Sequence, residues 1–359
     1  MKLFRVQFRP ARVALLLVFG LLLTGCAPIL APTMTAETPA TAAASATSES
    51  PQRTLVRVEL LPYLSFAPLF IAQDEGFFAE QGLDVEFVKL ADGAAPLAAL
   101  LQGDIDVSTP QIETGLLNAI ARGGIVKVVA DKGYLAADGC PAYALLARKE
   151  LVDSGKLAGP ADLKGLKMVI EPLTSEGYYL TKLLDQAQLS LDDITPVDVP
   201  APALADALKN GSVDLAHVGE PWITRLLNSG SASLWLPVKD VAPDFQWAVL
   251  AFGPTLLESN REAGQKFMQA YLQGVRQYNE GKTPRNLELV AKNTGLDVSL
   301  LEQACWPAIR NDGSINVQSA MDYQTWALAQ GLLDKTVTEE QLWDPSFVEQ
   351  ANKALGPTE

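Results

Sequence analysis

From Leu55 onward the chain alternates short β-branched runs with amphipathic stretches, and this alternation limits the possible folds more than any other feature. Leu55 to Leu61 has the alternation of a strand. The next helix begins near Pro68, because proline fits the first turn of a helix, and ends at Gly76, a good terminator. The alternation continues through Asp84 to Val88, Ala94 to Leu101, Ile105 to Val107, Glu113 to Ala121 and Ile125 to Ala130. Strand, helix and strand at this spacing predict a parallel sheet.

The part of the chain that carries this pattern, about 300 residues, is long enough for two α/β lobes. We assign residues 54–142 and 250–359 to the first lobe and residues 143–249 to the second. Tyr143 to Ala147 and Trp247 to Ala251 are predicted to be the two strands that cross between the lobes. A pair of crossovers predicts a hinge.

Residues 1–25 have the pattern of an export signal, with basic residues, an apolar run from Val13 to Leu23 and small residues before Cys26. The apolar run is too short to cross a membrane, which takes about 20 residues. The pattern resembles a bacterial lipoprotein signal, which implies that Cys26 is acylated and holds the protein on the extracytoplasmic face of the cell membrane. Residues 26–53 are rich in Ala, Thr, Pro and Ser and are predicted to form a flexible linker.

The charge of the chain excludes one class of partner. Lys and Arg number 28 and Asp and Glu 42, which gives a formal net charge of −14. Removal of the signal, with its four basic and no acidic residues, would bring the charge near −18. We expect no nucleic-acid partner, because phosphate contacts need a basic face and the chain has no Lys/Arg cluster.

Cysteine and histidine are too scarce for most metal and catalytic sites. Cys140 and Cys305 are compatible with a disulfide, which export would permit, or with two buried free thiols, which isolated cysteines favour. His217, the only histidine, ends a short apolar run and is predicted to be a hydrogen-bonded structural residue. We therefore expect no zinc site and no cofactor. The chain also lacks a Walker loop, a G-x-G-x-x-G motif and a G-x-S-x-G motif, which argues against an enzyme.

Three motifs carry a more specific signal. They are Pro62 to Leu83, with the core Ala-Pro-Leu-Phe-Ile-Ala-Gln-Asp-Glu-Gly-Phe-Phe, then Gly103 to Val107, and Gly211 to Leu215 followed by Glu220-Pro221-Trp222. In this order they resemble the periplasmic binding protein type 2 family that serves ABC importers of sulfonates, nitrate, thiamine pyrimidine precursors and riboflavin. The resemblance implies an α/β fold of two lobes, each with a mostly parallel sheet flanked by helices, and a permease and an ATPase as partners. We expect a monomer.

Ligands of open α/β sheets bind beyond the carboxyl ends of the strands, where helix N-termini present free N–H groups. The candidate ligand-binding residues lie in loops of this kind: Tyr63, Phe66, Thr109, Gln111, Tyr134, Thr174, Ser175, Tyr178, Glu220 and Trp222. Their aromatic members can stack on a flat ring, and their polar members can bind its edge. No arginine lies in these loops, and Glu220 would repel an anion. The pattern favours a small aromatic heterocycle, riboflavin or a thiamine pyrimidine precursor.

Alternatives remain open at this stage. Tyr63 and Phe66 are also suited to packing against their helix, and Thr174 and Ser175 are good N-cap residues whatever the function. Nitrate or a sulfonate such as taurine is the alternative ligand, held by Lys132 and the helix N-terminus, although Lys132 is predicted to be a solvated surface residue. An enzyme of the related pyrimidine-synthase branch is disfavoured by the single histidine. An adhesin is disfavoured by the absence of repeats.

Overall fold

A computed structural model describes residues 53–61, 63–90 and 94–357. The predicted signal, acylated Cys26 and nearly all of the predicted linker lie outside the described residues. The described residues form one compact unit. Of the helices in the described part of the chain, none combines the length and the apolar composition that crossing a membrane requires.

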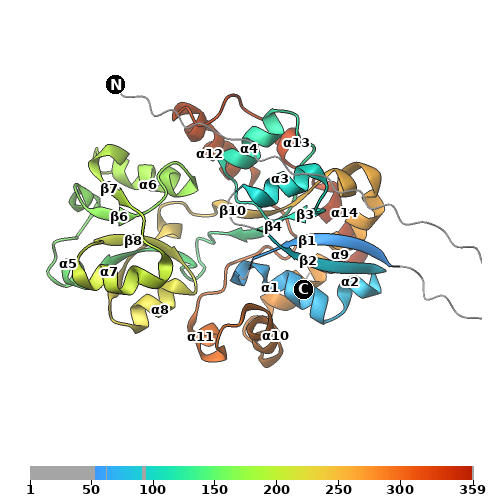
Figure 1. Cartoon of the computed structure of the whole chain (residues 1–359), viewed down its shortest axis with the longest axis horizontal. Helices are drawn as coiled ribbons and strands as arrows, with labels where there is room; N and C mark the ends of the chain where they lie inside the picture. The colour runs from blue at the N-terminus through green and yellow to red at the C-terminus, as the bar shows by residue number, and fades with distance from the viewer. Residues whose placement is uncertain (1–52, 62, 91–93, 358–359) are drawn as a thin grey trace, which may run out of the picture. The chain divides into compact units, whose positions relative to one another are not determined.

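The fold contains two five-stranded sheets with the same arrangement of strand directions (Figure 1). The first sheet has the order β2-β1-β3-β10-β4 and the second the order β7-β6-β8-β5-β9. In the first sheet β1 is parallel to β2 and β3, and in the second β6 is parallel to β7 and β8. One interior strand of each sheet, β10 or β5, is antiparallel to both of its neighbours. The predicted fold class of two mostly parallel sheets is confirmed.

The strands have the following bounds in the first sheet: β1 Thr54–Leu60, β2 Leu83–Lys89, β3 Val107–Ser108, β4 Lys127–Tyr134 and β10 Gln246–Phe252. In the second sheet they are β5 Tyr143–Arg148, β6 Lys167–Val169, β7 Thr195–Val197, β8 Leu215–Gly219 and β9 Ala232–Pro237. The two antiparallel strands contain the segments that the sequence predicts as crossovers: β5 begins at Tyr143, and β10 contains Trp247 to Ala251. The exact lobe boundaries stay predictions.

Helices cover both faces of each sheet (Figure 1). Those that pack with the first sheet or with one another around it are α1 Ala67–Asp74, α2 Phe77–Glu80, α3 Ala95–Gln102, α4 Thr114–Ala121, α9 Arg261–Asn279, α10 Pro284–Thr294, α11 Val298–Gln303, α12 Val317–Ala329, α13 Glu339–Leu342 and α14 Ser346–Leu355. Those of the second sheet are α5 Lys149–Asp153, α6 Ser175–Asp185, α7 Leu204–Asn210 and α8 Trp222–Asn228.

Alternating residues of the two antiparallel strands supply separate apolar cores. On β5, Leu145 packs with α6 in one cluster, while Leu146 packs with α7 and α8 in another. On β10, Leu250 faces the cluster with α1, α9 and α14, while Val249 faces the cluster with α3, α4 and α12. Successive side chains of a strand point to opposite faces of its sheet, so a strand with helices on both faces is apolar throughout. This is why both crossover segments are continuous apolar runs.

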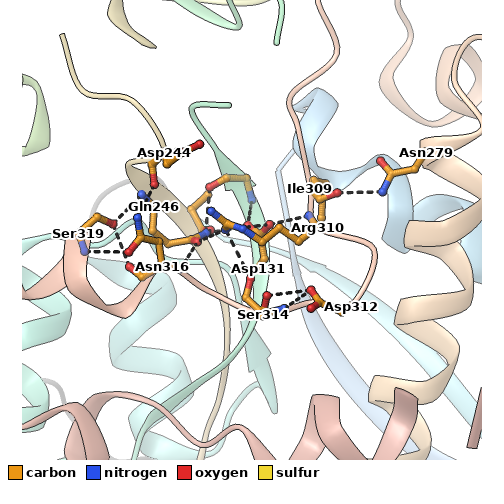
Figure 2. Close-up of polar contacts among 12 residues, drawn as sticks. Asp131, Asp244, Gln246, Asn279, Ile309, Arg310, Asp312, Ser314, Asn316 and Ser319 are labelled. Atoms are coloured by element: carbon orange, nitrogen blue, oxygen red, sulfur yellow. Dashed lines mark hydrogen bonds and ion pairs between the residues drawn. The ribbon is translucent and has the colours of Figure 1, made fainter. Parts of the chain in front are cut away.

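A buried polar network ties β4 and β10 to the segment after α11 (Figure 2). Asp131 of β4 is fully buried and accepts hydrogen bonds from Nε2 of Gln246 and from the backbone N–H of Arg310, both at 2.7 Å. Burial raises the pKa of Asp131 to about 6. The Arg310 guanidinium lies 3.7 Å from the ring centre of Tyr134. The network therefore fixes the end of β4, from which the chain continues toward the first crossover.

A disulfide joins Cys140, which precedes β5, to Cys305, which follows α11. The preference for two free thiols is therefore wrong. The two Cα atoms lie 5.7 Å apart because the C-terminal segment packs against the start of the crossover. A further contact supports this packing, since the N–H of Cys305 donates to Oε1 of Glu220 at 3.0 Å. A sequence separation of 165 residues gave no hint of this proximity.

Candidate functional site

The parallel strands of the second sheet end at an open pocket of about 550 Å³, here called the strand-end pocket. Its lining residues come from the ends of β6, β7 and β8 and from the start of α6: Val169, Ile170, Glu171, Glu176, Pro196, Val197, Asp198, Val199 and His217. Such a position beyond the carboxyl ends of parallel strands is where open α/β sheets bind ligands.

A second, smaller space of about 30 Å³ lies between residues of the two sheets and is here called the inter-sheet cavity. Gln111, Leu135 and Trp247 line it from the side of the first sheet. The second sheet and α6 contribute Tyr143, Ser175, Glu176, Tyr179 and His217. Because Glu176 and His217 also line the strand-end pocket, the two spaces are neighbours on either side of this pair.

His217, in the middle of β8, is held by two hydrogen-bonding partners. Its Nε2 lies 2.7 Å from the Tyr179 hydroxyl, and its Nδ1 lies 3.0 Å from Oε1 of Glu176. The ring also stacks on Tyr143, with ring centres 5.6 Å apart and planes 7° from parallel. The prediction of a hydrogen-bonded histidine is confirmed, and the structure adds that His217 faces both spaces.

The surroundings of Glu176 favour its ionised form. Burial opposes its charge, but the charge of His217, the hydrogen bond to His217 and the N–H of Glu171 together lower its pKa below the usual value. Its second oxygen, Oε2, accepts the Glu171 N–H at 2.8 Å. The carboxylate therefore lies at the N-terminal end of α6, where the free N–H groups of the helix favour negative charge.

Glu113, at the start of α4, faces Glu176 and Glu171 from the side of the first sheet. Burial and the negative charges of Glu171 and Glu176 raise its pKa to about 7. The Ser175 hydroxyl donates to its Oε1 at 3.4 Å, a long hydrogen bond that connects α6 to the chain segment before α4. Carboxyl groups from the start of α4 and from α6 thus lie near one another at this site.

Two glycines determine where the aromatic rings of the inter-sheet cavity lie. A Cβ atom on Gly133 would come within 2.6 Å of Cζ2 of Trp247, and one on Gly219 would come within 2.6 Å of Cε1 of Tyr143. Real Cβ atoms do not approach other atoms so closely, so the observed position of each ring requires a glycine, which has no Cβ, at the facing residue. The two rings meet edge to face with centres 4.8 Å apart.

The indole N–H of Trp247 is a donor without a partner. Its Nε1 is buried and has no hydrogen bond within the part of the chain that the structure describes. A buried donor without a partner costs about 1 to 3 kcal/mol, so this group favours any ligand that brings an acceptor. Its position in the lining of the cavity makes it a candidate ligand contact.

Of the ten residues predicted from the sequence, Gln111 and Ser175 line the inter-sheet cavity. Thr174 caps α6, as its side chain accepts the Glu176 N–H at 3.2 Å. Tyr63 is 52% exposed. Burial raises the pKa of Tyr143, and Glu176 and then Tyr63 raise it further, so Tyr63 lies near the cavity that Tyr143 lines.

The other predicted residues lie outside the lining of both spaces. Phe66 is fully buried in the core of α1, and Tyr178 packs against Phe245, Tyr323 and Trp326. Thr109 donates to the buried carboxylate of Glu59. For these residues a structural role accounts for the contacts that the structure shows.

Three predicted residues border the crossovers. Tyr134 stacks under the Arg310 guanidinium and lines a separate cavity of about 150 Å³ beside Cys140. Glu220 accepts hydrogen bonds from the N–H and the hydroxyl of Thr224, at 3.1 and 2.9 Å. Trp222 begins α8, and the Arg225 guanidinium lies 4.8 Å from the centre of the Trp222 ring. Ligand contact by these side chains remains a prediction.

The prediction of a solvated Lys132 is wrong. Lys132 is 2% exposed, donates to the Ser65 hydroxyl at 2.8 Å and lies 3.9 Å above the ring of Phe66. Burial lowers the pKa of Lys132 to about 7, although the negative charges of Glu59 and Asp131 act to raise it. The ring of Phe66 and the Ser65 hydroxyl take the place of water around the amino group, and no local pattern of residues indicates these contacts.

Sequence reasoning missed Tyr143, Glu176, Tyr179 and Trp247 as site residues. Tyr143 and Trp247 were available from one signal: both lie in segments predicted to cross between the lobes, and such strands must border the space between them. Glu176 directly follows the predicted helix cap.

Among the described residues, no group of three or more His, Cys, Asp or Glu side chains is arranged to hold a metal ion.

Comparison with known proteins identifies the family. The family model described as NMT1/THI5 like matches residues 64–280, more than half of the chain. The chain belongs to this family. YtlA of Bacillus subtilis, named as a binding protein, is 22% identical over 292 residues, which are 79% of this chain and 85% of YtlA. The nitrate/nitrite binding protein NrtA of a Nostoc species is 25% identical over 264 residues, which cover 66% of this chain and 56% of NrtA.

Solved structures agree on the fold. The ligand-binding component of an ABC-type import system from Staphylococcus aureus has a TM-score of 0.67 at 17% sequence identity. The match covers 83% of this chain and 99% of that protein. This chain therefore shares the fold of that protein.

Proposed function

We propose that this protein is the extracytoplasmic solute-binding component of an ABC importer, anchored by a lipid on Cys26 and working as a monomer with a permease and an ATPase. It captures a small aromatic heterocycle, such as riboflavin or a thiamine pyrimidine precursor, between its two lobes. Membership of the NMT1/THI5-like family and the names of YtlA and the Staphylococcus aureus protein support the receptor role.

One observation carries the ligand class. Three aromatic residues, Tyr143, Tyr179 and Trp247, line the space between the sheets together with Gln111 and Ser175. Flat rings stack on such side chains, while amide, hydroxyl and indole N–H groups bind the polar edge of a heterocycle. The indole N–H of Trp247 is free to donate, since it has no partner among the described residues. The present cavity of about 30 Å³ is too small for such a ligand, so binding requires the lobes to move apart first.

The second candidate is an anion receptor, because NrtA is named for nitrate and nitrite. Calorimetry with riboflavin, hydroxymethylpyrimidine, taurine and nitrate separates the two. We expect a heterocycle to bind and the two anions not to bind. Tight binding of taurine or nitrate alone would replace the proposed ligand class. If none of the four compounds binds, and a strain that lacks the protein imports them normally, the receptor role is wrong.

Replacement of Trp247 by Phe tests the site itself. Phenylalanine keeps an aromatic ring but removes the free N–H, so we expect affinity to fall by about 0.5 to 1.5 kcal/mol, the usual worth of one hydrogen bond. Trp235→Phe on β9 is the matched control, since Trp235 lines neither space. Equal affinities of the two variants would remove Trp247 from the site.

A further inference from the structure

We infer that the ligand carries a positively charged nitrogen, a protonated amine or an amidinium group, which lies beside the Glu176 carboxylate among the aromatic rings of the inter-sheet cavity. The inference rests on the proposed receptor function and narrows its ligand class by charge. It concerns the same two spaces, the strand-end pocket and the inter-sheet cavity.

Carboxylates predominate among the ionisable side chains that line these spaces, and His217, which lines both, is paired with Glu176. Glu171, Glu176 and Asp198 line the strand-end pocket, and Glu176 also lines the inter-sheet cavity. Within the described parts of the chain, neither lining contains a lysine or an arginine. An anionic ligand would find His217 as the only basic side chain that the described residues contribute to these linings, already paired with Glu176, whereas a cation would find the carboxylates of Glu171 and Asp198 as well.

The helix N-terminus, which could otherwise hold an anion, already has the Glu176 carboxylate in its first turn. The N–H of Glu176 is bound by the Thr174 hydroxyl, and the Glu176 carboxylate itself accepts the Glu171 N–H. The side chain therefore supplies the negative charge that the start of α6 favours. A sulfonate or nitrate placed there would have to displace this carboxylate or lie beside it.

Glu113 adds a second carboxylate from the opposite side. It faces Glu171 and Glu176, and the Ser175 hydroxyl is its hydrogen-bond donor. A cation between Glu113 and Glu176 would replace the repulsion of these carboxylates by attraction to both. Lys132 does not serve this purpose, because its amino group is buried against Ser65 and Phe66 and lines neither space.

The aromatic residues fit the same ligand. Tyr143, Tyr179 and Trp247 line the cavity next to Glu176. The faces of such rings attract ammonium and guanidinium groups as well as flat heterocycles. Carboxylate and aromatic faces together select an aromatic amine over a neutral ring and disfavour an aromatic acid.

Three probes of equal size and different charge test the inference: benzylamine, benzyl alcohol and benzoate. Binding is measured by calorimetry on the full chain in detergent at pH 8. We expect benzylamine to bind about tenfold or more tightly than benzyl alcohol, the effect of one charged hydrogen bond, and benzoate not to bind. Equal or tighter binding of benzyl alcohol or benzoate, or binding of none of the three, overturns the inference.

Two variants assign the effect to the carboxylates. Glu176→Gln should lower benzylamine affinity about tenfold and leave benzyl alcohol within about twofold. Asp198→Asn, on an exposed loop after β7, is the second variant in case loss of the Glu176 charge disturbs His217, and should lower benzylamine affinity about two- to threefold. Glu302→Gln, on exposed α11, is the control without effect. Unchanged benzylamine affinity in both pocket variants overturns the inference.

The outcomes separate this inference from the receptor function. If riboflavin, taurine or nitrate binds tightly while benzylamine does not, the protein is a receptor and the charge inference is wrong. If benzylamine binding depends on Glu176 but deletion of the protein leaves uptake of every cationic heterocycle tested unchanged, the site is correct and the importer function is wrong.

Discussion

Replacement of Glu113 by glutamine should stabilise the protein at alkaline pH and leave it unchanged at acid pH. Burial and the charges of Glu171 and Glu176 raise the pKa of Glu113 from 4.5 to about 7. The folded state therefore binds this proton more tightly than the unfolded state, so the free energy of unfolding falls as the pH rises from about 4.5 to about 7. Glutamine removes that dependence while it can still accept the hydrogen bond from Ser175.

The size of the effect follows from the shift. About 2.5 pKa units at 1.36 kcal/mol per unit give roughly 3 kcal/mol above pH 7. Because the side chain keeps partial contact with water, the expected gain in Glu113→Gln is about 1 to 3 kcal/mol at pH 8 and close to zero at pH 4.

Urea unfolding of the parent and the variant at pH 4, 6 and 8 measures this difference. Glu302→Gln serves as the control, because it removes a carboxylate from an exposed position on α11. A Glu113→Gln variant that is less stable than the parent at pH 8, or that differs by the same amount at pH 4 and pH 8, would refute the reasoning.

Three further predictions concern other parts of the molecule. Replacement of Cys140 and Cys305 by serine should lower the free energy of unfolding by about 2 to 5 kcal/mol, as measured by urea unfolding, because the disulfide closes a loop of 165 residues; equal stability with and without reductant would contradict this. Gly219→Ala should force the ring of Tyr143 aside, with a cost of about 1 to 3 kcal/mol in stability and a loss of ligand affinity in calorimetry. Unchanged affinity would show that the ring position is not needed. Cys26→Ala should leave an uncleaved or mislocalised precursor, and normal processing and membrane attachment in cell fractions would exclude the lipid anchor.

The fold could be predicted because its signals are local. The apolar runs of the strands and the proline and glycine limits of α1 depend on a few neighbouring residues each. The strands β7 and β9 were not predicted; β7 has only three residues and includes Pro196, whereas β9 has six. Their place in the second sheet depends on pairing with strands far away in the chain.

The site was harder to predict because it depends on which loops meet. Ser175 and Gln111, which line the inter-sheet cavity, were predicted as ligand contacts from their positions after strands, and ligand contact stays a prediction for both. Phe66 and Tyr178 follow the same rule, but their side chains point into apolar cores. Sequence position gives the loop but not the side-chain direction, and the buried Lys132 shows the same limit for charge.

The carboxylate of Glu176 at the start of α6 has a consequence for how such a scaffold changes specificity. A helix start offers the same N–H groups to any negative group, whether it belongs to the protein or to a ligand. With glutamate at this position the protein provides its own anion, whose Oε2 accepts the Glu171 N–H and whose Oε1 lies beside His217. Replacement of this one side chain by a small neutral residue would leave both donors and the helix start to a negative group of a ligand. In a two-lobed scaffold of this kind, a single codon can thus decide whether the protein or a ligand supplies the negative charge at this helix start, without any change in the sheets or the crossovers.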